Sequence, residues 1–240
     1  MHKINRDNSV YVLVHGAWHG GWCWKKVKPL LEVEGHSVFT PTLTGLGERS
    51  HLLSPQIDLS THIKDIVSML DYEDLYNVIL VGHSYAGMVI SGVAEKVAHR
   101  ISQLVYLDAF VPEDKKSVVD YLVVPSLDTI VSSKGDGWKI PFLGKIEDLG
   151  IIDKEDLDWA KPRIGDQPYK TFTETLNLAL PSSAIKTFIQ LSNFPWFAEA
   201  GDRAERMGFD YHQMLSGGHD AMISRPVDTA QIILQTTIKT

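Results

Sequence analysis

Ser84 is the residue whose sequence neighbours most clearly indicate a role in catalysis. It lies in VILVGHSYAGM (78–88), where a short apolar run ends in a serine flanked by small residues. A strand, a sharp turn and a helix in this order make a nucleophile elbow, which lifts the serine hydroxyl to the tip of the turn. The usual spacing is G-x-S-x-G, whereas here Ala86 takes the second glycine position and Gly87 follows. The pattern predicts a nucleophilic serine; the alternative is an ordinary Gly-His-Ser turn.

The segments around Ser84 alternate between strands and helices. Apolar, β-branched runs predict strands at 10–14, 37–40, 78–81, 104–107, 185–190 and 209–213. Apolar residues at helical spacing predict helices at 22–34, 60–70, 86–98, 196–207 and from 226 onward. This alternation predicts an α/β fold, a mostly parallel sheet with helices on both faces. Residues 1–111 and 184–240 would form the core domain. Residues 112–183, which contain no clear buried strand, would be an inserted lid over the carboxyl edge of the sheet, where ligands bind.

Composition limits the partners and the compartment. The chain has 240 residues, of which 44% are hydrophobic, and a formal net charge of -7, which argues against nucleic acid or an anionic membrane as the main partner. The single cysteine, Cys23, excludes an internal disulfide and fits a reducing compartment. No apolar leader precedes the first strand, so we expect a cytoplasmic protein. No phosphate-binding glycine pattern follows the first strand, and neither a cofactor nor a metal is expected. A homodimer stays open.

Four motifs together resemble a known family. They are VHGAWHGGW (14–22), TGLGERS (44–50), GHSYAGM (82–88) and GGHDAM (217–222). In this order and spacing they resemble the α/β-hydrolase superfamily. More closely, they are similar to the branch of plant methylesterases, hydroxynitrile lyases and small bacterial carboxylesterases, some of which act on pyrethroid-type esters. The resemblance covers the chain except the lid. It implies an α/β-hydrolase fold and a serine hydrolase.

A serine nucleophile needs a base within hydrogen-bond reach and a third group to orient that base. The resemblance points to His219 as the base, because it follows Gly217–Gly218 after the last predicted strand, where this fold carries it. It also implies that His83 packs beside the site without acting as the base. Five other histidines are expected at exposed positions: His2, His36, His51, His62 and His99.

The acid of the triad is the least determined residue. The family branch often carries it after the strand that follows the lid, where this chain has Asn193 and no carboxylate. In other members of the superfamily the acid stands at the end of the strand after the nucleophile helix, and this chain has Asp108 at that position. A carboxylate that ends an apolar strand needs a partner, and His219 could provide it. Glu199 and Asp202, on the next predicted helix, remain alternatives.

The oxyanion of an acyl-transfer reaction needs preorganised backbone donors. The elbow geometry assigns one donor to the N–H of Tyr85, and the resemblance points to the N–H of Ala17 as the other. Trp18 would be part of the pocket wall, together with His83. The lid is rich in apolar and aromatic side chains, which predicts a pocket suited to a small-to-medium hydrophobic ester.

Three chemistries compete at such a site. The first is ester hydrolysis through an acyl-enzyme with a Ser84–His219–Asp108 triad. The second is cyanohydrin cleavage, but lyases of this branch carry a threonine and a lysine where this chain has Gly16 and Asp220. An anion beside the catalytic histidine would disfavour a cyanide leaving group. The third is a non-catalytic ligand-binding protein on the same fold, which an assay with a chromogenic ester would distinguish from the first.

Overall fold

A six-stranded sheet forms the centre of the molecule. The computed structural model describes residues 8–122, 127–178, 184–191 and 194–237. The strands are β1 (Val10–Val14), β2 (Ser37–Phe39), β3 (Val78–His83), β4 (Ile101–Leu107), β7 (Ile185–Leu191) and β8 (Asp210–Met214). They lie in the order β2-β1-β3-β4-β7-β8, and each neighbouring pair is parallel. Because the strands are parallel, all of their carboxyl ends lie along one edge of the sheet.

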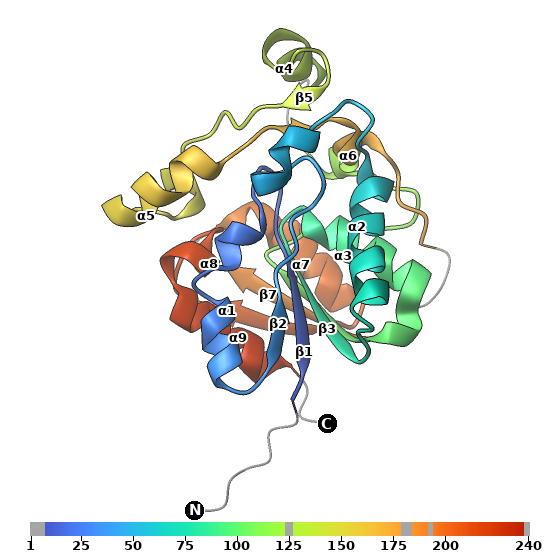
Figure 1. Ribbon diagram of the computed structural model, residues 1–240, viewed down its shortest axis with the longest axis vertical. Coiled ribbons are helices and arrows are strands. Elements are labelled where there is room, and N and C mark those ends of the chain that lie inside the picture. The colour runs from blue at the N-terminus through green and yellow to red at the C-terminus, as the bar shows by residue number, and fades with distance from the viewer. Residues whose placement is uncertain (1–7, 123–126, 179–183, 192–193, 238–240) are drawn as a thin grey trace, which may run out of the picture.

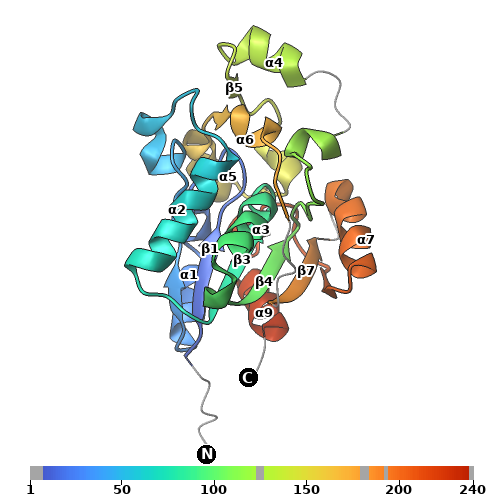
Figure 2. The ribbon, with the colours of Figure 1, turned by 90° about the vertical axis from the view of Figure 1, so that its right-hand side faces the viewer.

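Helices cover both faces of this sheet (Figure 1; Figure 2). One face packs against α2 (Leu59–Tyr72), α3 (Ala86–Val97) and α7 (Ala198–Arg206). The other packs against α1 (Lys28–Val33), α8 (Ala221–Ser224) and α9 (Pro226–Thr236). Two separate hydrophobic cores result, one on each side of the sheet. The α/β-hydrolase fold predicted from the sequence is confirmed by this arrangement.

The segment predicted as a lid lies above the carboxyl edge of the sheet, at the end of the molecule opposite the two termini (Figure 1). It carries α4 (Leu127–Lys134), β5 (Lys139–Ile140), α5 (Lys154–Ala160), β6 (Gln167–Pro168) and α6 (Lys170–Thr173). β5 and β6 pair antiparallel as a small separate sheet. The boundaries at 112 and 183 stay a prediction, because 179–183 lie outside the described residues.

One predicted helix differs in the structure. The expected helix at 22–34 is divided into a 3-10 helix, η1 (Gly21–Trp24), and α1, which begins at Lys28. Pro29 explains the division, because proline has no N–H to donate and is tolerated only in a first helical turn. Elsewhere α2 begins as expected, with the Asp58 carboxylate accepting the Thr61 N–H at 2.8 Å. Among the helices described, none is both long enough and apolar enough to cross a bilayer.

Candidate active site

Ser84 directly follows β3 and adopts a left-handed backbone conformation, with φ of +55°. Such a conformation costs a non-glycine residue about 1–3 kcal/mol, and it persists only where its surroundings impose it. The Ser84 N–H donates to the Leu107 carbonyl at 3.3 Å, and its own carbonyl accepts the N–H groups of Gly87 and Phe110, both at 3.1 Å. The turn is therefore held by β4 and the residues after it, and Ser84 lies at the sheet's carboxyl edge.

The structure explains why the variant spacing of the elbow motif is tolerated. A Cβ added at Gly87 would lie 1.9 Å from the Phe110 carbonyl oxygen, and one at Gly82 would lie 2.8 Å from the Ala86 carbonyl oxygen. Both positions require glycine because backbone approaches backbone. Ala86 is fully buried and its methyl group is accommodated. The close approach of α3 to the chain after β4 thus occurs at residue 87.

Asp108 and His219 form a buried pair beside the elbow. The Nδ1 of His219 lies 2.7 Å from Oδ2 of Asp108, and these side chains are 8% and 0% exposed. Asp108 follows β4, also in a left-handed conformation, with φ of +44°. Its second oxygen, Oδ1, accepts the Gln190 side-chain N–H at 2.9 Å and the Leu191 backbone N–H at 3.3 Å. Burial raises the pKa of Asp108, and the hydrogen bond and charge of His219 oppose that shift.

The other two acids considered from the sequence lie elsewhere. Glu199 and Asp202 are both exposed on α7, whereas Asp108 contacts the histidine. Asn193, at the commoner acid position, is outside the described residues. The structure therefore brings Asp108 to His219 and leaves Glu199 and Asp202 in solvent. Sequence reasoning did not include Gln190, which orients Asp108 from the neighbouring strand.

Packing fixes the orientation of the His219 ring. Phe194 stacks on it at a centroid distance of 4.4 Å, and Phe197 stacks on it at 5.2 Å. The Nε2–H of His83 donates to the His219 carbonyl at 2.9 Å, and the two imidazole rings are 4.4 Å apart. Burial lowers the pKa of His83 far below its ordinary value, so this ring is neutral. His83 thus contacts the loop of His219 without carrying charge.

The loop of residues 15–21 lies against the elbow. A Cβ added at Gly16 would lie 3.0 Å from the Ser84 Cβ, so this backbone touches the serine and Ala17 follows directly. The Nδ1–H of His15 donates to the Gly16 carbonyl at 2.8 Å, and its Nε2 accepts the Leu43 N–H at 3.1 Å. Burial lowers the pKa of His15 to about 3, so it is neutral. The Gly16–Ala17 peptide, whose N–H is the predicted oxyanion donor, is thereby fixed in orientation.

Tyr85 and His62 form a buried contact that corrects one expectation. His62 was expected to be solvated, but it is fully buried, with Nδ1 3.0 Å from the Tyr85 hydroxyl and Nε2 3.0 Å from the Thr44 carbonyl. The expectation was wrong because His62 lies on the buried face of α2, the face that also carries Ile66. Burial lowers the pKa of His62 to about 4. The Tyr85 side chain is consequently a core contact, and only its backbone N–H is available as an oxyanion donor.

Trp18 connects the loop of residues 15–21 to the predicted lid. Its indole N–H donates to the Ile140 carbonyl at 2.9 Å, its backbone N–H donates to Gln167 Oε1 at 3.1 Å, and its carbonyl accepts the Gly165 N–H at 2.9 Å. The rings of Phe142 and Phe172 lie edge-on to it at 5.6 and 5.9 Å. The polar atoms of Trp18 thus hydrogen-bond to the predicted lid, and its indole belongs to an aromatic cluster.

A second histidine–carboxylate pair lies next to the His219–Asp108 pair, because its carboxylate belongs to the residue that follows His219. His19 and Asp220 are both buried, with Nε2 of His19 3.0 Å from Oδ2 of Asp220. Asp220 was expected to be an unbalanced anion beside His219, but His19 balances its charge. The prediction of no metal assumed that the histidines lack an H-x-x-x-H spacing, which is wrong, because His15 and His19 have it. Each of these rings has separate hydrogen-bond partners.

One group of side chains has the composition of a metal site. His83, His219 and Asp220 bring ligand atoms within 4.8 Å of one another. Each is already committed: His83 to the His219 carbonyl, His219 to Asp108, and Asp220 to His19. We therefore interpret the cluster as a hydrogen-bonded network.

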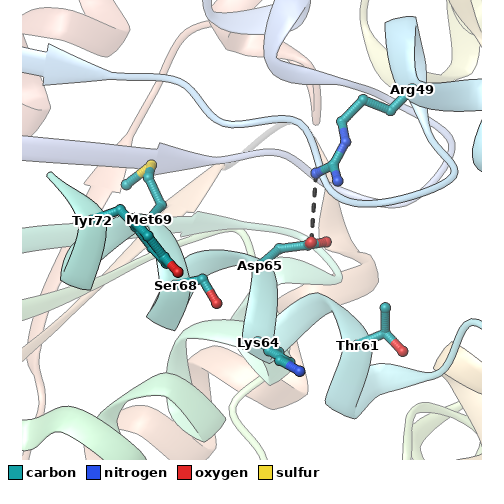
Figure 3. Close-up of a pocket in the computed structure, with 7 residues that line it drawn as sticks. All are labelled: Arg49, Thr61, Lys64, Asp65, Ser68, Met69 and Tyr72. Carbon is teal, nitrogen blue, oxygen red and sulfur yellow. Dashed lines mark hydrogen bonds and ion pairs between the residues drawn. The ribbon is translucent and has the colours of Figure 1, made fainter.

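Two surface hollows lie away from these residues. One, of about 400 Å³, is lined by side chains of α2 and Arg49 (Figure 3). Arg49 and Asp65 form an ion pair of 3.5 Å within it, and Asp65 also accepts the Thr44 N–H at 2.6 Å. These contacts hold residues 44–49 against α2. The other hollow, of about 470 Å³, lies near Tyr106 and Glu113. Neither is lined by Ser84, Asp108 or His219, so neither is assigned to the substrate.

A strand–turn–helix serine beside a buried histidine–aspartate pair, on a parallel sheet, defines the class of α/β hydrolases. A model of the "Alpha/beta hydrolase family" matches residues 11–232, and the chain belongs to that family. The chain is 37% identical over 239 residues to the "Carbendazim hydrolyzing esterase" of Nocardioides sp. (strain SG-4G), covering 92% of this chain and 96% of that protein. The chain is a carboxylesterase of the α/β-hydrolase kind, as the sequence predicted.

Two further comparisons follow, of which the first agrees with the esterase assignment and the second with the fold. Methylesterase 1 of Arabidopsis thaliana is 40% identical over 118 residues, which cover 45% of this chain and 41% of that protein. Among solved structures, an extracellular α/β-hydrolase from a Paenibacillus species superimposes with a TM-score of 0.83 at 24% identity, covering 95% of this chain and 98% of that one. The predicted resemblance to plant methylesterases and bacterial esterases is confirmed.

Proposed function

We propose that this carboxylesterase acts through an acyl-enzyme on Ser84, with His219 as the base and Asp108 as the acid. The observation that carries the proposal is the 2.7 Å contact of His219 Nδ1 with Asp108 beside a serine on a strained turn. A carboxylate only accepts hydrogen bonds, so Nδ1 carries the proton. The Nε2 of His219 is then free to take the proton of the Ser84 hydroxyl as it attacks the ester carbonyl.

The tetrahedral intermediate needs donors for its oxygen. We assign these to the N–H groups of Ala17 and Tyr85. The Ala17 donor is supported by the close approach of the neighbouring Gly16 backbone to Ser84. The Tyr85 donor is supported by its position directly after Ser84 in the chain. The protonated His219 then gives its proton to the leaving alcohol oxygen. A water activated by the same histidine hydrolyses the acyl-enzyme and releases the acid. Asp108 holds the ring and stabilises its charged form throughout.

The substrate class we propose is small-to-medium hydrophobic carboxylic esters. Aromatic rings surround the candidate residues: Phe194 and Phe197 pack on His219, and Phe142 and Phe172 pack on Trp18. An apolar surround binds the acyl or alcohol group by removing its surface from water. Trp18 and His83 would be part of the pocket wall. The names of the relatives suggest carbendazim and methyl esters as the first substrates to test.

The compartment we propose is the cytoplasm. The only cysteine, Cys23, is buried, and burial raises its thiol pKa well above the ordinary value, so it is held as a neutral thiol. We further propose that the enzyme has no nucleic-acid partner, in keeping with its net charge of -7. Fractionation of cells with an antibody to the chain tests the compartment; recovery outside the cytoplasm would contradict it.

The kinetic test uses p-nitrophenyl esters of increasing acyl length, carbendazim, and the variant Ser84→Ala. We expect turnover by the wild-type enzyme and a fall in kcat by a factor on the order of 10⁶ in the variant, with the fold intact by circular dichroism. Ser68→Ala is the matched control, because Ser68 lines the hollow on α2 and has no assigned role (Figure 3). Unchanged turnover by Ser84→Ala, or loss of turnover in Ser68→Ala, would place the chemistry elsewhere.

A further inference from the structure

The buried His19–Asp220 pair carries an inference that goes beyond the triad. His19 is 3% exposed and Asp220 is 0% exposed, and their side chains meet at 3.0 Å. The other ring nitrogen of His19, Nδ1, lies 2.7 Å from the Ala17 carbonyl oxygen. Trp22 stacks on the imidazole at 5.3 Å. His19 therefore connects the backbone of Ala17 to a residue about 200 positions later in the chain.

The partners of His19 determine its protonation. A carbonyl oxygen only accepts, so Nδ1 must carry a proton. The carboxylate of Asp220 also only accepts, so Nε2 carries the second proton and the ring is an imidazolium. Burial by itself would lower the pKa of His19, but the charge and hydrogen bond of Asp220 outweigh it and the pKa is raised. Burial likewise works to raise the pKa of Asp220, and His19 outweighs it, which lowers the value to about 2.

The pair lies between the two parts of the candidate site that must keep a fixed separation. Ala17 supplies the proposed oxyanion donor, and Asp220 directly follows His219. His15 holds the peptide on the amino side of Ala17 through the Gly16 carbonyl, and His19 holds the peptide on its carboxyl side through the Ala17 carbonyl. Both peptide planes that flank the Cα of Ala17 are therefore fixed, and these planes set the direction of its N–H.

The backbone and the side chain of Asp220 are also held by neighbouring groups. Its backbone N–H donates to the Leu149 carbonyl at 2.9 Å, which ties it to the predicted lid. Its Oδ1 lies 3.9 Å from the Nε2 of His83, the same nitrogen that donates to the His219 carbonyl. A displacement of Asp220 would thus move the loop that carries the base.

We propose that His19 and Asp220 are positioning residues, an ion pair that holds the loop of residues 15–21 at a set distance from the loop of His219. The proposal rests on the proposed function, because it assigns the Ala17 N–H to the oxyanion. The oxyanion exists only after substrate has bound, so loosening the pair lowers kcat and leaves KM nearly unchanged. Removing a donor outright costs a factor of about 10²–10³, and misplacing one costs about 10- to 100-fold.

The test uses the double variant His19→Gln/Asp220→Asn. It removes both charges together, because a single substitution would leave one buried charge unpaired and could prevent folding. The amides are close in size to the side chains they replace and can still hydrogen-bond to each other without carrying charge. We expect a folded protein whose kcat falls about 10- to 100-fold while KM stays within about threefold. Inhibition by a trifluoromethyl ketone, which forms a tetrahedral adduct with the serine, should weaken by the same factor as kcat.

The matched control is the same pair of substitutions at His212 and Asp210 on β8. These side chains meet at 2.8 Å but are 35% and 60% exposed, and His212→Gln/Asp210→Asn should behave as wild type. A folded His19→Gln/Asp220→Asn variant with wild-type kcat and ketone affinity would overturn the proposal, as would a loss carried entirely by KM. Failure of the double variant to fold would show a structural role alone and would also overturn it. Activity in Ser84→Ala would instead contradict the proposed function, so the two failures are distinguishable.

Discussion

Asp108→Asn tests the triad acid, and the structure determines how the new amide must turn. Oδ1 of Asp108 faces two donors, the Gln190 side-chain N–H and the Leu191 N–H, whereas Oδ2 faces His219. An amide offers one accepting oxygen and one donating NH₂. If the NH₂ occupied the Oδ1 site, it would oppose two donors. The amide oxygen therefore takes that site, and the NH₂ points at His219.

This orientation reverses the hydrogen bond to the base. The Nδ1 of His219 must then accept, so the proton moves to Nε2, the nitrogen that has to take the Ser84 proton. A histidine held in the wrong tautomer by the corresponding substitution in another triad lowers kcat by about 10⁴. That factor corresponds to about 5 kcal/mol of lost transition-state stabilisation. The side chain keeps its volume, so the fold should survive.

The assay is ester turnover by Asp108→Asn, with Glu199→Gln and Asp202→Asn as controls that change exposed carboxylates on α7. Circular dichroism checks the fold of each. We expect turnover to collapse only in Asp108→Asn. If it stays within about threefold of wild type while a control collapses, the acid lies on α7 and the reasoning is wrong. If all three variants remain active, the site is a Ser–His dyad.

Two further predictions concern stability. Three histidines are buried in their neutral form because burial lowers their pKa values: His15, His62 and His83. Each binds a proton in the unfolded chain below its ordinary pKa of about 6.5, so each destabilises the fold by about 2 kcal/mol at pH 5 relative to pH 8. His19 works in the opposite sense: its raised pKa stabilises the fold below pH 6.5, and this contribution is lost as pH rises, so it offsets part of the fall in stability from pH 8 to pH 5. Urea unfolding at both pH values measures this, and equal stability would contradict it. The second is that Gly87→Ala lowers Tm by about 5–10 °C, because its Cβ would meet the Phe110 carbonyl. Gly165→Ala, where an added Cβ meets no atom within 4 Å, should leave Tm unchanged in the same melting experiment.

Much of the fold could be predicted because its signals are local. The strand β3 and the turn at Ser84 follow from a short apolar run and a cluster of small residues. Asp108 was identified for a local reason too, as a carboxylate ending an apolar strand. The division of the helix predicted at 22–34 was also predictable, because Pro29 interrupts its periodic apolar pattern.

Other parts depend on contacts between distant residues and leave no local signal. Gln190 reaches Asp108 across 82 positions, and His19 reaches Asp220 across 201. Spacing along the chain gives no indication of either contact. His62 is different, because Leu59 and Ile66 share its face of α2 and the helical period could have placed it in the core. The segment predicted as a lid was the least predictable part, since its helices and strands are short.

The central claim is that Ser84, His219 and Asp108 act together with the N–H groups of Ala17 and Tyr85. A crystal structure of the enzyme treated with a p-nitrophenyl phosphonate ester tests it most directly. We expect phosphorus bonded to Ser84 Oγ, His219 Nδ1 still hydrogen-bonded to Asp108, and the phosphoryl oxygen about 2.7–3.1 Å from both backbone nitrogens. Phosphorus on another residue, or a phosphoryl oxygen pointing away from Ala17 and Tyr85, would contradict it.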